Sequence, residues 1–240
     1  MKKTLVTLLA LTGIAAADTS IIDNAYIGFS DFSTGVADYG TKIDDITVST
    51  VDSVTTLTGV TFDTPRTGST RDCYSITLVL DASKIGSVDA YTSLAAAYFG
   101  ETDAVGFGVN QNGKLQGQWG TGSYNWLCGD VPTTGTITLT FTTGEIVNDS
   151  NGEGSRLYID DSSIYYSSTG LRTGDCTFNT IKINNLNGAI EQVYVHNYAL
   201  TKDEVGTLMT EIASLSVPEP TTATLSLLAL AGLAARRRRK

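Results

Sequence analysis

Two tryptophans and a tyrosine lie close together near the middle of the chain, and side chains of this kind can bind sugars. Trp119, Tyr124 and Trp126 fall within the glycine-rich stretch GQWGTGSYNWLCGD, which holds both tryptophans of the sequence. Flat aromatic faces can cover the apolar face of a sugar ring, so the three residues are candidates for carbohydrate binding. The alternative is that at least one of them packs between two sheets, where large aromatic side chains are usually buried.

A short run of acidic and amide residues has the spacing of a calcium loop. Asp149, Asn151 and Glu153 alternate along the chain and precede Gly154, and Asp160 follows Asp149 by eleven residues. Oxygen ligands at alternating positions suit Ca²⁺, which is the one cofactor that the sequence indicates. The flanking residues resemble strands rather than helices, so a hairpin loop rich in Asn and Gly is the favoured alternative.

The only histidine and the three cysteines form no familiar catalytic or zinc-binding pattern. A Ser-His-Asp triad or a histidine metal site would have to use His196, and a partly exposed side chain at the end of a strand is the favoured interpretation. Cys73, Cys128 and Cys176 allow one disulfide in an oxidising compartment. Cys128–Cys176 and Cys73–Cys176 are both open as the pairing.

The elements that must position these residues are short strands. Alternating or β-branched stretches predict six of them, at 74–80, 136–141, 156–160, 163–166, 178–183 and 190–195. Clusters of Gly, Asn and Asp separate the stretches, as turns require. Many short strands joined by turns favour a β-sandwich with a single domain.

One helix is predicted at the end of this domain. Thr201 and Glu204 have the spacing of a capping box, in which each side chain binds the backbone N–H of the other residue. Apolar residues then recur at helical spacing, at Val205, Leu208, Met209 and Ile212. The segment therefore predicts an amphipathic helix.

The chain begins with a predicted secretion signal. Lys2 and Lys3 precede an apolar run over 5–17, which closes with three alanines at 15–17. A basic start, a short apolar run and small residues at its end are what signal peptidase accepts. We therefore predict that residues 1–17 are removed and that the domain covers residues 18–216.

The net charge of −9 conceals a sharp division between the domain and the two ends of the chain. Seven of the 16 basic residues lie at the ends, so residues 18–216 hold nine basic against 24 acidic residues, a net charge near −15. Such a surface repels phosphate backbones, and nucleic acid is therefore excluded as a partner.

The last segment, residues 217–240, has three parts in a fixed order. A Pro-Glu-Pro triplet precedes about 15 apolar residues, fewer than the ~20 that a bilayer core requires, and a basic cluster ends the chain. Basic residues stay cytoplasmic, so this short predicted transmembrane helix would anchor the domain on the far side of the inner membrane. The residues of the motif are Pro218, Glu219, Pro220, Arg236, Arg237, Arg238 and Arg239.

This order resembles the PEP-CTERM sorting signal of Gram-negative bacteria. The resemblance implies transient membrane anchoring, processing by an exosortase and delivery to the outer surface or the extracellular matrix, often with exported polysaccharide. It covers only the tail and carries no information about the activity of the domain.

The second half of the domain is similar to laminin-G-like and concanavalin A-like domains. A strand at 191–197 leads through Tyr198-Ala199-Leu200-Thr201 into a helix, and the hairpin at 156–161 has Asp161 where the family pattern has Gly. The resemblance implies a jelly-roll sandwich of two antiparallel sheets. Hydrolases of this superfamily place their carboxylates on one strand, and Glu145 with Asp149 has the wrong offset for that.

The expected function is therefore non-catalytic. We expect an exported, surface- or matrix-directed protein that binds carbohydrate or another matrix polymer through loops at the edge of the sandwich. A structural or adhesive envelope component without a small ligand is the main alternative, and a glycan hydrolase is the least favoured one.

Overall fold

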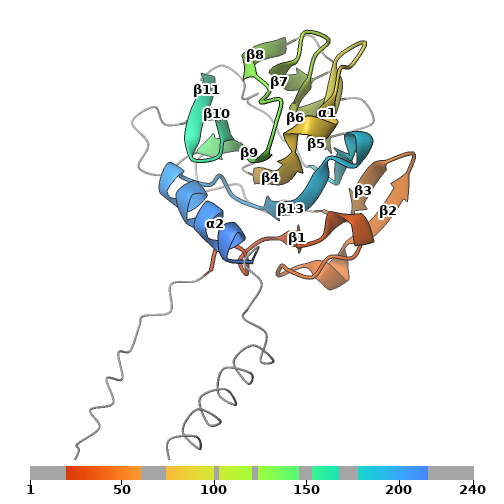
Figure 1. The fold of residues 1–240 in the computed structure, drawn as a ribbon. Coiled ribbons are helices and arrows are strands. Elements are labelled where there is room, and N and C mark those ends of the chain that lie inside the picture. Colours follow the sequence, from red (N-terminus) through yellow and green to blue (C-terminus); the bar gives the residue numbers. More distant parts are fainter. Residues whose placement is uncertain are drawn as a thin grey trace, which may run out of the picture.

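The domain is built from two antiparallel sheets that pack face to face (Figure 1). The computed structural model describes residues 20–60, 74–99, 103–120, 124–145, 153–167 and 178–215. Within this part, one sheet has six strands in the order β1-β13-β4-β9-β10-β11 and the other has seven in the order β2-β3-β12-β5-β6-β7-β8. The predicted sandwich of two antiparallel sheets is confirmed.

The bounds of the elements follow the chain. The six-stranded sheet contains β1 (Ile27–Phe29), β4 (Tyr74–Asp81), β9 (Thr136–Glu145), β10 (Glu153–Ile159), β11 (Ser162–Ser167) and β13 (Ile190–His196). The seven-stranded sheet contains β2 (Thr47–Val51), β3 (Val54–Thr58), β5 (Thr92–Phe99), β6 (Asp103–Val109), β7 (Lys114–Gly120), β8 (Tyr124–Asp130) and β12 (Thr180–Asn184). The helices are α1 (Ala82–Ile85), α2 (Lys202–Leu215) and three short 3₁₀ turns, η1 (Phe32–Thr34), η2 (Ile43–Asp45) and η3 (Leu186–Gly188).

Alternation of side chains explains why the predicted strands form. In β12, Ile181 and Ile183 enter the core between the sheets while their neighbours are only half-buried. Strand β4 is buried on both faces, because its Ile76 and Leu78 face the other sheet and its Val79 lies beneath α2. Since both faces of β4 are covered, seven of its eight residues are buried.

Helix α2 covers the outer face of the six-stranded sheet, and its start matches the sequence prediction. The backbone N–H of Thr201 donates to the Glu204 carboxylate at 2.7 Å, and the N–H of Glu204 donates to the Thr201 hydroxyl at 3.2 Å. The predicted capping box is therefore confirmed. Val205, Leu208 and Ile212 pack from α2 onto the sheet, against Val79, Tyr158 and Tyr194.

The first described residues are fastened to α2. The Glu211 carboxylate accepts hydrogen bonds from the backbone N–H groups of Ile21 at 3.0 Å and Ile22 at 2.8 Å, and from the Ser20 hydroxyl at 3.1 Å. The two apolar side chains of this turn join the cluster beneath α2. The described part of the chain thus begins and ends on the same side of the sandwich (Figure 1).

His196 lies beneath this N-terminal turn, and here the expectation of a partly exposed side chain is wrong. The ring is fully buried, and its Nε2 lies 3.0 Å from the carbonyl oxygen of Ile21. The ring of Tyr198 meets it edge-on at 5.4 Å. The sequence separation of 175 residues between the hydrogen-bonded partners explains why local pattern did not predict this burial.

Strands β5 and β6 approach each other closely at two glycines. A Cβ atom on Gly106 would lie 2.1 Å from the carbonyl oxygen of Ala95, and one on Gly108 would lie 2.2 Å from that of Thr92. These distances are far below van der Waals contact, so the register of the two strands requires glycine at both positions.

The two ends of the chain, 1–19 and 216–240, lie outside the described residues. The predicted signal peptide and the predicted C-terminal hydrophobic helix therefore remain predictions. Within the described residues, no helix is both long enough and apolar enough to cross a membrane.

Candidate functional site

One end of the sandwich gathers loops from distant parts of the sequence. In the register of β13 with β4, His196 pairs with Ser75 at one end and Ile190 pairs with Leu80 at the other. At this second end, α1 follows β4, η3 precedes β13, and η1 follows β1. The turn between β2 and β3 lies there too, because the backbone N–H of Asn185 donates to the Ser53 carbonyl at 2.8 Å. We call this the loop end.

A polar hollow opens at the loop end between η1, the β2–β3 hairpin and η3. Its volume is about 410 Å³. Hydroxyl and amide groups dominate the lining, and none of the lining side chains is ionisable. The lining residues are Phe32, Ser33, Thr34, Gly35, Thr50, Ser53, Thr55, Asn185 and Gly188.

The hydrogen bonds of the polar hollow leave both donors and acceptors for a ligand. Thr50 and Thr55 share one hydrogen bond of 2.9 Å between their hydroxyls, so one O–H of the pair stays available whichever of them donates. The Asn185 side-chain oxygen accepts from the backbone N–H of Ile190 at 2.8 Å, which leaves its NH₂ group as a donor. The Ser33 hydroxyl donates to Asp31 at 2.6 Å and keeps its lone pairs as acceptors.

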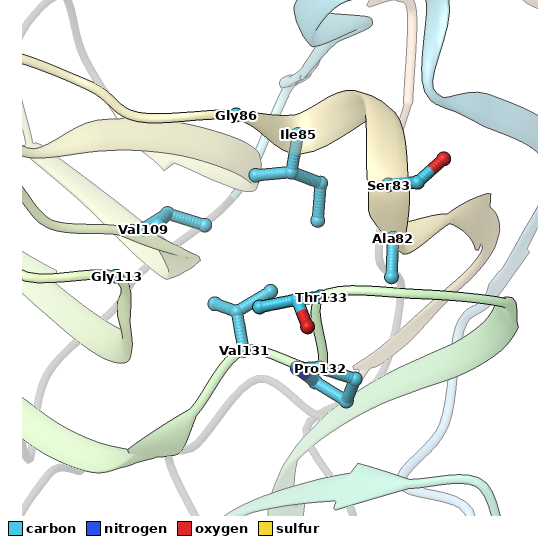
Figure 2. A pocket seen from close by; sticks show the side chains of 9 residues that line it. All are labelled: Ala82, Ser83, Ile85, Gly86, Val109, Gly113, Val131, Pro132 and Thr133. Atoms are coloured by element: carbon cyan, nitrogen blue, oxygen red, sulfur yellow. The ribbon is translucent and has the colours of Figure 1, made fainter.

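A second, smaller hollow lies beside α1 and is mainly apolar (Figure 2). Its volume is about 210 Å³. Ile85 from α1 and Val131 from the β8–β9 connection point toward one another across it, whereas the Ser83 hydroxyl points away (Figure 2). Its lining consists of Ala82, Ser83, Ile85, Gly86, Val109, Gly113, Val131, Pro132 and Thr133.

The carboxylate of Asp81 fixes the short helix that bounds this apolar hollow. It accepts hydrogen bonds from the backbone N–H of Ser83 at 3.0 Å and from the Ser83 hydroxyl at 2.6 Å. This N-cap contact, with Lys84 at 3.6 Å, holds the pKa of Asp81 below its usual range. Local capping thus lets a four-residue helix form.

One side chain joins the two hollows. The Asn187 amide nitrogen donates to the backbone carbonyls of Lys84 at 3.1 Å and Ile85 at 3.3 Å. Ile85 lines the apolar hollow, while Asn185 and Gly188 line the polar one. The hollows are therefore neighbours on either side of the α1–η3 contact.

The three aromatic candidates lie on β7 and β8, at the edge of the seven-stranded sheet. Trp119 pairs with Tyr124, and Trp126 pairs with Gly117. Across the next strand, the same rows continue to Val105 and Phe107, which are buried core residues. The register thus brings the three positions together, in rows shared with the core. Their contact with sugar stays a prediction.

The candidate calcium loop lies mostly outside the described residues. Asp149 and Asn151 fall in the undescribed segment 146–152, and Glu153 is the first residue of β10. In the described part of the chain, no group of three His, Cys, Asp or Glu side chains could hold a metal ion. The hairpin prediction for the flanks agrees with β9 and β10, which pair in antiparallel fashion.

Only one of the three cysteines belongs to the described residues. Cys128 is half-buried on β8, and burial raises the pKa of its thiol to about 11. Cys73 and Cys176 lie in undescribed segments, so the disulfide pairing stays a prediction.

A comparison with protein-family models identifies the tail. Residues 216–240 match the PEP-CTERM protein-sorting motif. The chain carries a PEP-CTERM sorting signal. This signal implies export with a membrane-anchored sorting step and processing by an exosortase. The match covers only the tail, and no curated protein matches the chain.

Solved structures similar to this PEP-CTERM protein are β-sandwich proteins. A sialidase from Trypanosoma rangeli has 13% identity and a TM-score of 0.48, over 71% of this chain and 29% of that chain. The CBM40 domain of a Ruminococcus gnavus IT-sialidase, bound to α2,3-sialyllactose, has 14% identity and a TM-score of 0.43, over 58% and 83%. The binding domain of botulinum neurotoxin DC, in complex with rat synaptotagmin II, has 14% and 0.44, over 70% and 42%. The chain thus spans less than a third of that sialidase, and no ligand or residue role is taken from these similarities.

Sequence reasoning missed the residues of both hollows. Ser33-Thr34-Gly35 and the segment 185–188 carry the composition of turns, which signals loops but no partner. The two segments meet only because β1 and β13 are neighbours in the six-stranded sheet. No signal within either segment could have predicted that meeting.

Proposed function

We propose that this exported protein is a non-catalytic carbohydrate-binding module that engages matrix polysaccharide through the loop end of its sandwich. The observation that carries the proposal is the polar hollow, whose lining combines hydroxyl and amide groups without an ionisable side chain. Sugars present many hydroxyls that both donate and accept, so a mixed uncharged lining satisfies them. The volume of about 410 Å³ lies within the range of small-molecule sites, about 300–1,000 Å³.

A binding role accounts for the lining better than hydrolysis does. Glycoside hydrolysis needs two carboxyl groups on either side of the scissile bond. Neither hollow has a carboxylate in its lining. The sorting signal supports the same conclusion, because it delivers the domain out of the cytoplasm, where a matrix polymer would be its partner.

The test is a pair of matched substitutions on β2. Thr50→Val removes a hydroxyl from the polar hollow, and Thr47→Val removes one from the opposite face of the same strand. Both threonines are exposed and both replacements keep the side-chain volume. We expect Thr50→Val to weaken binding to an immobilised neutral glycan by about threefold to tenfold, the value of one hydrogen bond. Thr47→Val should leave binding unchanged.

The binding assay should use the full-length protein in a zwitterionic detergent without a sugar head group. Retention on a panel of immobilised polysaccharides, measured with calcium and then with a chelator, would also test the predicted calcium loop. If no polysaccharide retains the protein in either condition, the carbohydrate proposal is wrong and a structural or adhesive role remains. Trp119→Ala and Trp126→Ala on the same panel test the aromatic prediction separately.

A further inference from the structure

The size of the apolar hollow suggests that it does not act alone. At about 210 Å³ it is smaller than the about 300 Å³ at which small-molecule sites begin. Its neighbour, the polar hollow, is separated from it only by the contact of Asn187 with Lys84 and Ile85. A ligand larger than one sugar unit could therefore occupy both hollows at once.

The chemistry of the two hollows is complementary. Sugar units have hydroxyls around the ring edge and C–H groups on the ring faces. Ile85, Val131 and Pro132 offer an apolar surface for C–H groups, and Thr50, Ser53 and Asn185 offer hydrogen bonds for hydroxyls. One polymer that presents both kinds of surface along its length matches this arrangement.

The charges around the hollows favour a neutral polymer. A buried carboxylate or sulfate requires a cationic partner, usually arginine or lysine, to offset its lost hydration. No lysine or arginine lines either hollow. The ammonium group of Lys84, on the nearby helix α1, is paired with Asp81 at 3.6 Å. Acidic Asp31 and Asp52 stand next to lining residues in sequence, and the domain as a whole carries a net charge near −15.

We propose that the two hollows are subsites of one groove that binds an extended, neutral polysaccharide and rejects anionic ones. The inference rests on the proposed carbohydrate-binding function and adds the ligand class, the minimum length and the second subsite. Two consequences follow. Affinity should rise with chain length until both hollows are filled, and uronic-acid polymers of equal length should bind more weakly.

The test uses calorimetric titration of the full-length protein in the same detergent. The probes are neutral gluco- and manno-oligosaccharides of two and six units and oligogalacturonates of the same lengths. We expect the neutral hexamers to bind at least about tenfold more tightly than the dimers, and the oligogalacturonates to bind more weakly than the neutral sugars of equal length.

Matched variants assign the length effect to the apolar hollow. Val131→Thr adds a hydroxyl there without a change of volume, and Val51→Thr makes the same change at a side chain that is 69% exposed and lines neither hollow. We expect Val131→Thr to reduce the gain from dimer to hexamer, and Thr50→Val to weaken dimers and hexamers alike. Thr133→Trp, which fills the apolar hollow from its exposed rim, is the second variant and should also remove the gain.

The possible outcomes separate this inference from the function on which it rests. Equal affinity for dimers and hexamers, or a length effect that Val131→Thr and Thr133→Trp leave intact, overturns the second subsite but not carbohydrate binding. Tighter binding of oligogalacturonates overturns the neutral selectivity alone. If none of the probes binds and the panel of polysaccharides retains no protein, both proposals fail.

Discussion

The buried His196 predicts a specific loss of stability in mild acid. Burial is the main cause that lowers its pKa, from 6.5 to about 4, and the Ile21 carbonyl and the carboxylates of Glu204 and Glu211 offset only part of that effect. The carbonyl can only accept, so Nε2 carries the hydrogen and Nδ1 would have to take up the second proton. In the described structure, the buried Nδ1 has no hydrogen-bond partner.

The sign and size follow from the two pKa values. Above pH 6.5 the ring is neutral in both the folded and the unfolded chain, so it does not change stability. Between pH 6.5 and pH 4 the unfolded chain binds a proton that the folded chain does not, and the free energy of unfolding falls. At 1.36 kcal/mol for each pKa unit, the total loss is about 3 kcal/mol, most of it complete by pH 4.5.

The control is His196→Gln, which keeps an N–H donor for the Ile21 carbonyl but cannot titrate. Urea unfolding at pH 7.5 and at pH 4.5 should show the wild type losing about 2–3 kcal/mol more than the variant, because acidic groups titrate alike in both. His196 is the only histidine, so an NMR titration of its ring reports its pKa directly. A measured pKa near 6.5, or equal losses in the two proteins, would refute the reasoning.

Two further predictions concern stability. Gly106→Ala should destabilise the domain by more than about 2 kcal/mol in urea unfolding, because its Cβ would lie 2.1 Å from the Ala95 carbonyl; Gly206→Ala, on α2 with nothing within 4 Å, should instead stabilise it by up to about 1 kcal/mol, and similar effects at both sites would contradict the close approach of β5 and β6. Glu211→Gln should weaken the attachment of the N-terminal turn, so that amide hydrogen exchange at Ile21 and Ile22 accelerates at least about tenfold while core strands such as β4 exchange as before. Unchanged exchange at both residues would show that the packing of their side chains suffices.

The sequence predicts those features of the fold that depend on neighbouring residues. The alternation in β12 and the capping box of Thr201 and Glu204 are local patterns, and both occur in the structure as predicted. The hairpin between β10 and β11 was also expected, with Asp160 rather than glycine at a positive φ of 53°. The Asp160 carboxylate accepts from the backbone N–H of Thr138 at 3.0 Å, which helps to hold this conformation.

The candidate site could not be predicted because it depends on contacts between distant residues. Asn187 contacts α1 about a hundred residues earlier in the chain, and the Thr50–Thr55 pair gains its meaning only beside Asn185. His196 shows the same limit, since its environment is set by a turn 175 residues away. Attention to conspicuous residue types directed the sequence prediction to the tryptophans, whereas common serines, threonines and asparagines line the hollow.

The attachment of the N-terminal turn to α2 has a consequence for how the domain meets a polymer. Because the described chain begins and ends on one side, a domain held by its sorting tail points its loop end away from the point of attachment. The distance along β13 is about 20 Å for its seven residues. Copies anchored in one bilayer would present their grooves in a common layer, and a long glycan could be bound by several copies simultaneously. Retention on the cell surface would then depend on avidity, so that individually weak sites hold a polymer firmly until the tails are cut.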